Sequence, residues 1–297
     1  MTSPNLDLLF VLAHPDDESF GSGGLISWLR EQDLRVGLVC ATRGESGQIS
    51  DPSLGSPEML GAVRERELRT AMSIAGVEPV RLLPYRDSGM DGTPENDDPR
   101  SLVQAPRESV LADVICQLRD LKPTNVVTFG PDGIYGHPDH IKIGDIATEA
   151  VHLAAEDAYP FLGEPWRVSH LYHSAVARED LIESASGPHG PIAGLPLDLV
   201  SEMGTPRAEI THVFDIRPYI EAKLRLMRPH ATQLPHNPEP GSPQDPATRP
   251  RLNRESLKHI PLPWNGPDDQ PSVVDRFHSP ELAGTPARFV SASVPTE

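Results

Sequence analysis

Short apolar runs alternate with longer amphipathic segments through residues 1–175. A continuous apolar run of about five residues is typical of a strand buried on both faces, whereas apolar positions spaced three or four apart are typical of a helix. The predicted strands are Asp7–Ala13, Arg35–Cys40, Val80–Pro84, Asn125–Phe129, Val168–Tyr172 and, further along, Ile210–Ile216. The predicted helices are Gly23–Gln32, Pro57–Ile74, Ser109–Leu121, Asp139–Ala155 and Arg217–Met227. This alternation predicts an α/β fold with an open, mainly parallel sheet and helices on both faces.

The pattern changes at Pro229, after which prolines are frequent and long apolar runs are few. We therefore expect one α/β domain over residues 1–228. A proline-rich extension over residues 229–297 is expected to consist mostly of loops that pack on the domain or cap it.

Composition narrows the range of partners. The chain has 297 residues, 37% of them hydrophobic, and a formal net charge of −17 at pH 7. This charge argues against nucleic-acid binding and against stable association with an anionic membrane, and favours a small-molecule partner. Cys40 and Cys116 lie in apolar surroundings, as expected of core residues in a reducing compartment, and the amino-terminal segment has no basic leader. We expect a cytoplasmic protein; the sequence leaves its oligomeric state open, a homo-oligomer included.

The first predicted strand runs directly into the segment HPDDE, which contains His14, Asp16, Asp17 and Glu18. Carboxylates packed this closely repel one another unless a cation lies among them. By itself the segment could be a helix start, with acids in the first turn favoured by the helix dipole. Glu18 fits that structural role better than a ligand role. The nearby GSGG (21–24) is a poor dinucleotide fingerprint, because the preceding acids would repel a pyrophosphate.

A second polar cluster, GPDGIYGHPDH (130–140), follows the fourth predicted strand and carries His137, Asp139 and His140. In a doubly wound sheet of order 3-2-1-4-5, the first and fourth strands are neighbours. The ligand crevice then opens at their carboxyl ends. The topology therefore predicts that the two clusters meet.

Together the clusters predict a catalytic metal site. His14, one aspartate of the first cluster and one histidine of the second would leave a coordination position open for water, as in catalytic zinc sites. The remaining aspartate could act as a base on that water, and a further histidine could donate a proton or stabilise an oxyanion. The set His14, Asp16 and His140 also fits the triad of non-haem iron oxygenases. Those with this spacing are generally β jelly rolls, so a hydrolase is the better interpretation.

AHPDDE after an amino-terminal strand, followed by GHPDH, resembles the LmbE-like family, which includes the N-acetylglucosaminyl-phosphatidylinositol de-N-acetylases (PIG-L). The resemblance implies a Rossmann-like fold and zinc-dependent removal of N-acyl groups from amino sugars. TRGESG (42–47), VRERELRTA (63–71), YRDSGM (85–90) and HATQ (230–233) look like segments of its mycothiol-pathway branch, which contains a deacetylase and a mycothiol S-conjugate amidase. The match spans residues 7–233, with gaps.

The resemblance also implies roles for single residues. The metal ligands fall on His14, Asp17 and His140, and the general base falls on Asp16. The metal is expected to be Zn²⁺, although Fe²⁺ and Co²⁺ suit the same ligands. The resemblance implies that His137 acts as general acid or stabilises the oxyanion, with Tyr135 assisting at the oxyanion. It implies that Asp139 orients a histidine. The positions implied to hold sugar or inositol hydroxyls or to close the pocket are Arg64, Asp87 and His230.

The expected reaction is therefore hydrolysis of the acetamide of an amino sugar, with N-acetylglucosaminyl-inositol as first choice. The stretch LPHNPEPGSPQDPATRPR after Gln233 does not align with the mycothiol enzymes. A mycothiol S-conjugate amidase and a deacetylase of an antibiotic amino sugar thus stay as alternatives. A non-catalytic sugar-binding protein is disfavoured, because the ligands and the base are all present.

Overall fold

The computed structural model describes residues 5–186, 197–234, 253–265 and 271–283. Its centre is a seven-stranded sheet of order β3-β2-β1-β4-β5-β7-β6. The strands are β1 (Leu8–Leu12), β2 (Val36–Cys40), β3 (Val80–Leu82), β4 (Asn125–Phe129), β5 (His170–Ser174), β6 (His212–Asp215) and β7 (Arg254–Ile260). The first five are parallel, and β7 pairs antiparallel with both β5 and β6. The predicted α/β class and the order 3-2-1-4-5 are confirmed.

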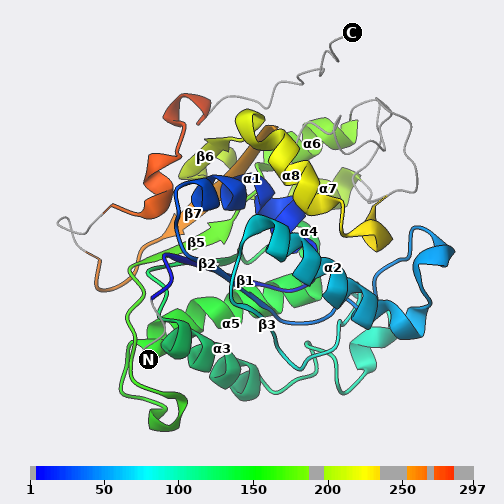
Figure 1. Cartoon of the computed structure of the whole chain (residues 1–297), viewed down its shortest axis with the longest axis horizontal. Coiled ribbons are helices and arrows are strands. Elements are labelled where there is room, and N and C mark those ends of the chain that lie inside the picture. Colours follow the sequence, from blue (N-terminus) through cyan, green and yellow to red (C-terminus); the bar gives the residue numbers. More distant parts are fainter. Residues whose placement is uncertain (1–4, 187–196, 235–252, 266–270, 284–297) are drawn as a thin grey trace.

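Helices cover both faces of the sheet, as Figure 1 shows. On one face lie α3 (Arg107–Leu121) and α5 (Pro138–Ala154); on the other lie α1 (Asp17–Glu31), α2 (Leu60–Ala75) and α8 (Ile220–Met227). The other α-helices of the described residues are α4 (Gly133–Gly136), α6 (Arg178–Ser186) and α7 (Leu197–Glu202). Every residue of β1, β2 and β4 is buried, as expected of strands covered on both faces.

The register places the carboxyl ends of β1 and β4 side by side. Leu8 pairs with Asn125 and Phe10 with Val127 in a parallel ladder. The loops that leave these two strands therefore emerge at the same edge of the sheet. These are the loops that carry the two polar clusters.

The carboxyl-terminal region contributes a strand that the sequence pattern did not predict. β7 was expected to be loop, because RESLKHI has few apolar positions. It lies inside the sheet because both neighbours satisfy its backbone hydrogen bonds, with Ser174 paired to Leu257 on one side and His212 to Leu257 on the other. Its buried Glu255 is satisfied by the Lys223 ammonium at 2.8 Å and by two backbone N–H groups of α1. The division of the chain at residue 228 stays a prediction.

Helix α1 begins earlier than predicted, at Asp17 instead of Gly23. Its first residues, Asp17 and Glu18, are acids, which stabilise the positive end of the helix dipole. The GSGG segment lies within the helix, where it permits close packing. A Cβ on Gly24 would come within 2.6 Å of Ile216, and one on Gly23 within 3.0 Å of Lys223. The glycines therefore let the α8 region lie directly on α1.

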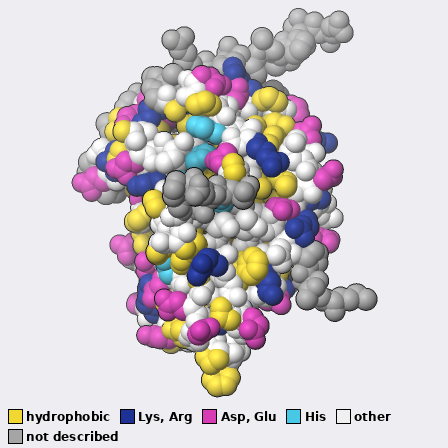
Figure 2. All heavy atoms as spheres, turned by 90° about the vertical axis from the view of Figure 1, so that its left-hand side faces the viewer, with side chains coloured by type: hydrophobic (Ala, Val, Ile, Leu, Met, Phe, Trp, Pro, Cys, Tyr) yellow, Lys and Arg dark blue, Asp and Glu magenta, His cyan; other side chains and the backbone are white. Residues whose placement is uncertain are grey.

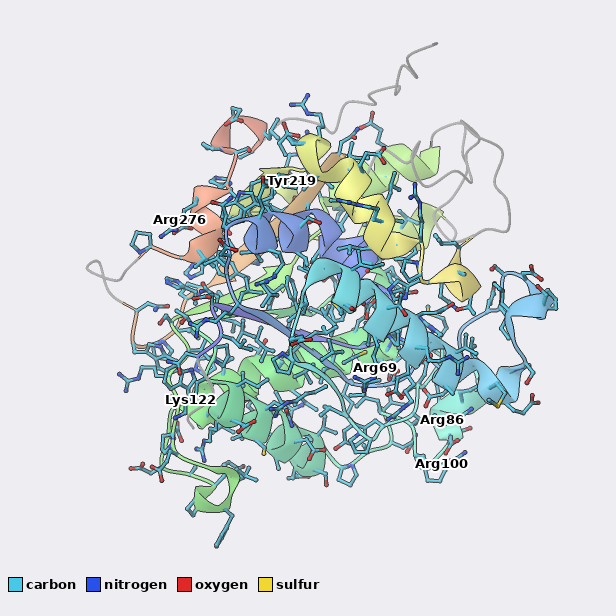
Figure 3. The ribbon with its side chains drawn as sticks, viewed as in Figure 1. Arg69, Arg86, Arg100, Lys122, Tyr219 and Arg276 are labelled. Atoms are coloured by element: carbon cyan, nitrogen blue, oxygen red, sulfur yellow. The ribbon has the colours of Figure 1, made fainter. Side chains whose placement is uncertain are left out.

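The same two helices are tied at the surface. The Tyr219 hydroxyl, just before α8, donates a hydrogen bond of 2.5 Å to Glu31 at the end of α1. Tyr219 is labelled in Figure 3, where it lies above the blue ribbon of α1. Packing and surface contact together fix α8 against the helix that carries Asp17.

The surface mixes charges of both signs. In the face drawn in Figure 2, acidic and basic side chains are interspersed among the described residues. Cys40 and Cys116 are both free thiols. Within the described residues, no helix combines the length and the apolarity needed to cross a membrane.

Candidate active site

The first polar loop turns sharply after β1. Asp16 has a left-handed backbone, with φ of 104°, and its carbonyl accepts hydrogen bonds from the N–H groups of Ser19 and Phe20. The N–H of His14 donates to the Asp17 carboxylate at 2.7 Å. The loop therefore folds back on itself and directs His14 and Asp17 to the same side.

The second polar loop follows β4 and leads into α5. His137 is the N-cap of α5, its Nδ1 accepts the N–H of Asp139 at 3.2 Å, and proline occupies the first helical position. Asp139 and His140 then lie in the first turn and are almost completely buried. Gly144 lets the helix approach β4, because a Cβ there would lie 2.5 Å from the carbonyl oxygen of Phe129.

The two loops bring His14, Asp17 and His140 together. His14 Nδ1 lies 3.1 Å from His140 Nε2 and 3.7 Å from Asp17 Oδ2, while His140 Nε2 lies 3.3 Å from Asp17 Oδ1. Two ligands bound to zinc at about 2.0–2.1 Å in a tetrahedral arrangement are separated by about 3.3–3.4 Å. The two nitrogens are therefore spaced much as two ligands of one zinc ion would be, and Asp17 approaches each of them with a different carboxylate oxygen.

Hydrogen bonds on the far side of each imidazole suit metal binding. His14 Nε2 lies 3.2 Å from Asp139 Oδ2, and His140 Nδ1 lies 3.1 Å from the Gly133 carbonyl. A proton held on each of these nitrogens leaves His14 Nδ1 and His140 Nε2 with free lone pairs. Metal-binding histidines are commonly fixed in this way by a carboxylate or a carbonyl.

Two groupings among the described residues are compact enough to hold a metal with one atom from each residue: His14, His137 and His140, and His14, Asp87 and Asp139; neither includes Asp17. The second grouping uses His14 Nε2, whose neighbour Asp139 also binds the Ser88 N–H at 2.9 Å and the Ser88 hydroxyl. That carboxylate is already well satisfied. His137 is therefore the main alternative to Asp17 as the third metal ligand.

Asp16 lies beside the ligand cluster with an Arg64 nitrogen 3.1 Å from its carboxylate. Burial raises the pKa of Asp16 to about 6, although Arg64 lowers it in part. Arg64 is itself buried and also donates to the carbonyls of Pro15 and Gly44, at 2.6 and 2.7 Å. Arg64 was predicted to bind substrate; it borders the cleft, but its guanidinium holds the loop of Asp16.

His137 and Tyr135 border the same space. The rings of His137 and His14 lie 4.5 Å apart, and burial together with His14 and His140 lowers the pKa of His137 to about 3. Because Nδ1 accepts the Asp139 N–H, the neutral ring carries its proton on Nε2. Tyr135 lies 5.0 Å from His140, ring to ring, and burial raises the pKa of its hydroxyl, which stays a hydrogen-bond donor.

A cleft of about 910 Å³ opens over these groups. Six of the predicted site residues border this cleft: His14, Asp16, Arg64, Asp87, Tyr135 and His137. Asp87 Oδ1 lies 3.5 Å from His14 Nε2, and the Gly89 N–H donates to the same oxygen at 2.8 Å. Burial raises the pKa of Asp87, but His14 outweighs burial, so the carboxyl stays ionised.

His230 was predicted to close the pocket, but the structure places it behind the pocket wall. It is fully buried, and its Nε2 lies 2.8 Å from Glu18 Oε1 and 3.3 Å from the Ser19 hydroxyl. Glu18 Oε2 in turn accepts the N–H of Asp16 at 3.0 Å. His230 therefore supports the loop of Asp16 from behind.

Sequence reasoning missed two supporting residues. Ser88 binds Asp139 through both its N–H and its hydroxyl. Phe20 borders the cleft one turn after Asp17. Ser88 lies in the YRDSGM segment, so that motif could have indicated its role in the site. No sequence motif indicated a role for Phe20.

The site lies at the carboxyl edge of a mainly parallel sheet. The chain belongs to the PIG-L family, which is described as GlcNAc-PI de-N-acetylase. The sequence model of this family matches residues 9–151. Relatives extend the match well beyond that range. The chain is 38% identical over 238 residues to the 1D-myo-inositol 2-acetamido-2-deoxy-alpha-D-glucopyranoside deacetylase of Rhodococcus jostii, covering 76% of this chain and 81% of the relative. It is 37% identical over 241 residues to the protein of the same name from Thermobispora bispora, with 76% and 79% covered.

Solved structures share the fold. N,N'-diacetylchitobiose deacetylase from Pyrococcus horikoshii superposes with a TM-score of 0.60 at 22% identity, covering 86% of this chain and 83% of that one. The 4-carboxy-2-hydroxymuconate hydratase GalB of Pseudomonas putida gives 0.56 at 19% identity, covering 89% and 99%. A deacetylase and a hydratase therefore share this architecture, so the reaction has to be argued from the site.

Proposed function

We propose that this protein is a zinc-dependent deacetylase that hydrolyses the acetamide of N-acetylglucosaminyl-inositol. The observation that carries the proposal is the spacing of His14 Nδ1, Asp17 and His140 Nε2, with Asp16 beside them. The names of the relatives from Rhodococcus jostii and Thermobispora bispora supply the substrate. Iron or cobalt would suit the same ligands, and we further propose that the enzyme acts in the cytoplasm.

His14, Asp17 and His140 would hold the ion. A bound zinc ion would supply an activated water, by lowering its pKa towards about 7, and would polarise the amide carbonyl. Asp139 and the Gly133 carbonyl keep the two imidazoles in the tautomers that such binding needs.

Asp16 would act as general base. Its carboxylate borders the cleft, and the raised pKa of about 6 suits a group that must accept a proton near neutral pH and release it again. Arg64 anchors this carboxylate and the Pro15 carbonyl, so it would orient the base. The water oxygen would form a bond to the acyl carbon while Asp16 takes its proton.

His137 and Tyr135 would stabilise the oxygen that becomes negative during the attack. The neutral His137 ring offers its Nε2–H, and Tyr135 offers its hydroxyl; a donor of this kind is worth about 10²–10³ in rate. The C–N bond then breaks, and the amine leaves with the proton held by Asp16. The low pKa of His137 favours this route over protonation of the amine by an imidazolium.

The sugar and inositol would occupy the polar cleft. Asp87 is ionised and borders it, so its carboxylate suits recognition of hydroxyl groups. A small uncharged sugar also suits a chain of net charge −17, which favours no polyanion as partner.

The test is release of primary amine from N-acetylglucosaminyl-inositol by the zinc-loaded protein and by its Asp16→Asn variant. Release by the wild type alone supports both reaction and base. The panel should include other N-acetylglucosaminides, a mycothiol S-conjugate and an acetylated antibiotic amino sugar. A higher kcat/KM for one of these would reassign the substrate, and no release from any would contradict the proposal.

A further inference from the structure

A second cavity lies against the site, on the other side of Tyr135 and Phe20. It has a volume of about 230 Å³, and these two aromatic side chains border both it and the cleft. The cleft and this rear chamber are thus neighbours that share a wall.

The ligand cluster lies between the two spaces. His14 and Asp16 border the cleft, whereas Asp17 and His140 border the rear chamber. Since His14 Nδ1 is only 3.1 Å from His140 Nε2, a carbonyl carbon beside this cluster would have access to both spaces. An amide substrate has two substituents there, the amine side and the acyl side.

The two spaces differ in chemistry. The cleft presents carboxylates, an arginine and amide groups, which suit a polyol. The rear chamber is mainly apolar; its apolar border is formed by Leu12, Phe129, Ile134, Ala175, Val176 and Ala177. Charged side chains also border it, among them Asp180, Glu183 and Arg254.

From this division we infer that the rear chamber is an acyl-binding site, and that the enzyme accepts N-acyl groups longer than acetyl on the same amino sugar. The inference rests on the proposed function. With the sugar in the polar cleft, the acyl substituent extends past Tyr135 and Phe20 into the apolar chamber. The hydrolysis is unchanged: water adds to the acyl carbon, the C–N bond breaks, and the products are the amine and a longer carboxylate.

The size of the chamber sets the length of the chain. An apolar cavity of about 150 Å³ holds a benzene molecule. A chamber of about 230 Å³ therefore has room for an acyl chain of roughly four to six carbons. The methyl of an acetyl group leaves most of it unfilled, and the charged side chains on its border disfavour longer apolar chains.

The experiment compares N-acetyl, N-butanoyl, N-hexanoyl and N-dodecanoyl glucosaminyl-inositol by release of primary amine. We expect kcat/KM to rise from acetyl to butanoyl, by up to about fourfold for each methylene that is buried, and to fall again for dodecanoyl. Hexanoate should also raise the melting temperature of the zinc-loaded protein more than acetate does, which gives a reading without turnover.

Ala175→Leu places a larger side chain on the border of the rear chamber. Gln233→Ala is the control, because Gln233 borders the cleft. We expect Ala175→Leu to lower the hexanoyl-to-acetyl ratio of kcat/KM at least tenfold and to abolish the extra stabilisation by hexanoate. Gln233→Ala should change all substrates by a similar factor. Ala177→Leu repeats the test if the first variant does not fold.

The outcomes separate the two proposals. No amine from any substrate would overturn the proposed function. Efficient release from the acetyl substrate, with kcat/KM falling tenfold or more at butanoyl, would overturn the acyl site alone. An Ala175→Leu variant that loses kcat on the acetyl substrate, with an unchanged acyl-length ratio, would identify the chamber as an exit for acetate and would likewise overturn it.

Discussion

Glu18 and His230 form a buried pair, with Oε1 and Nε2 2.8 Å apart and both side chains at most 1% exposed. Burial lowers the pKa of His230, but the Glu18 carboxylate outweighs burial and raises it. The pair lies directly behind Asp16, whose N–H also binds Glu18. The backbone of the proposed base is therefore held by Glu18, whose own partner His230 lies more than two hundred positions away.

His230→Ala should lower the free energy of unfolding by about 3–5 kcal/mol, because it leaves a buried carboxylate without its partner. Urea unfolding of the purified protein measures this. Arg100→Ala is a suitable control, since the Arg100 side chain is exposed and its pair with Asp98 should contribute at most about 1 kcal/mol. A loss below 1 kcal/mol in His230→Ala would show that the pair does little to hold the loop.

Metal content should identify the third ligand. We expect His14→Ala, Asp17→Ala and His140→Ala each to lose most of the bound zinc, while His137→Ala keeps it and loses activity. Mass-spectrometric metal analysis of protein purified without chelators gives the stoichiometry. If His137→Ala loses zinc and Asp17→Ala retains it, the three-histidine grouping holds the ion instead.

Removal of zinc by a chelator should abolish amine release, and readdition should restore it. The same treatment of Asp16→Asn should leave a protein that binds zinc again without recovering activity, with kcat about 10²–10⁴-fold below wild type. Activity that survives complete removal of the metal would contradict the proposed chemistry.

Arg64→Lys tests whether Arg64 orients the base or holds the sugar. A lysine ammonium carries its donors on one nitrogen and cannot reproduce the planar fork with which Arg64 reaches Asp16, Pro15 and Gly44. The base should therefore shift, and kcat should fall about 10²-fold with little change in KM. Steady-state kinetics separates the two roles. A higher KM with an unchanged kcat would instead support the sugar-binding role implied by the sequence resemblance.

His173 should make the protein less stable in acid. Burial, with Lys258, lowers its pKa to about 4, and its Nε2 lies 2.9 Å from the Thr148 hydroxyl. Below pH 6.5 the unfolded chain takes up a proton that the folded chain does not, so stability falls as pH drops from 6.5 towards 4. The contribution is about 1.5 kcal/mol between pH 6.5 and 5.

The measurement is the free energy of unfolding of wild type and His173→Gln at several pH values. The variant should depend less steeply on pH in this window. His152→Gln, on the outer part of α5, serves as the matched histidine control. Identical slopes for wild type and His173→Gln would contradict the prediction.

The sequence was most informative where burial is complete on both faces. β4 was predicted at its observed ends, because NVVTF is rich in β-branched and aromatic residues and is buried throughout its length. β5 was displaced by two residues, since in HLYHS only Leu171 and Tyr172 are apolar or aromatic and polar residues occupy both ends. β7 was missed because its stability comes from two neighbouring strands, which no local pattern records.

The candidate site shows the same division. The meeting of His14 with His140 followed from strand order, and the structure brings them within 3.1 Å. Their roles in binding a metal stay predictions. The position of His230 did not follow, because its partner Glu18 is distant in sequence and neither residue lies in a pattern that would pair them.

The place of β7 in the sheet also sets an order of assembly during synthesis. β6 leaves the ribosome before β7, yet within the described sheet its strand neighbour is β7 alone. Glu255, which binds Lys223 and the N–H groups of Gly24 and Leu25, is made later still than all three. A nascent chain that has already produced His14, Asp17 and His140 therefore still lacks the strand that fixes α1 and α8 together. The edge of the sheet nearest the rear chamber can be completed only after Arg254–Ile260 has been made.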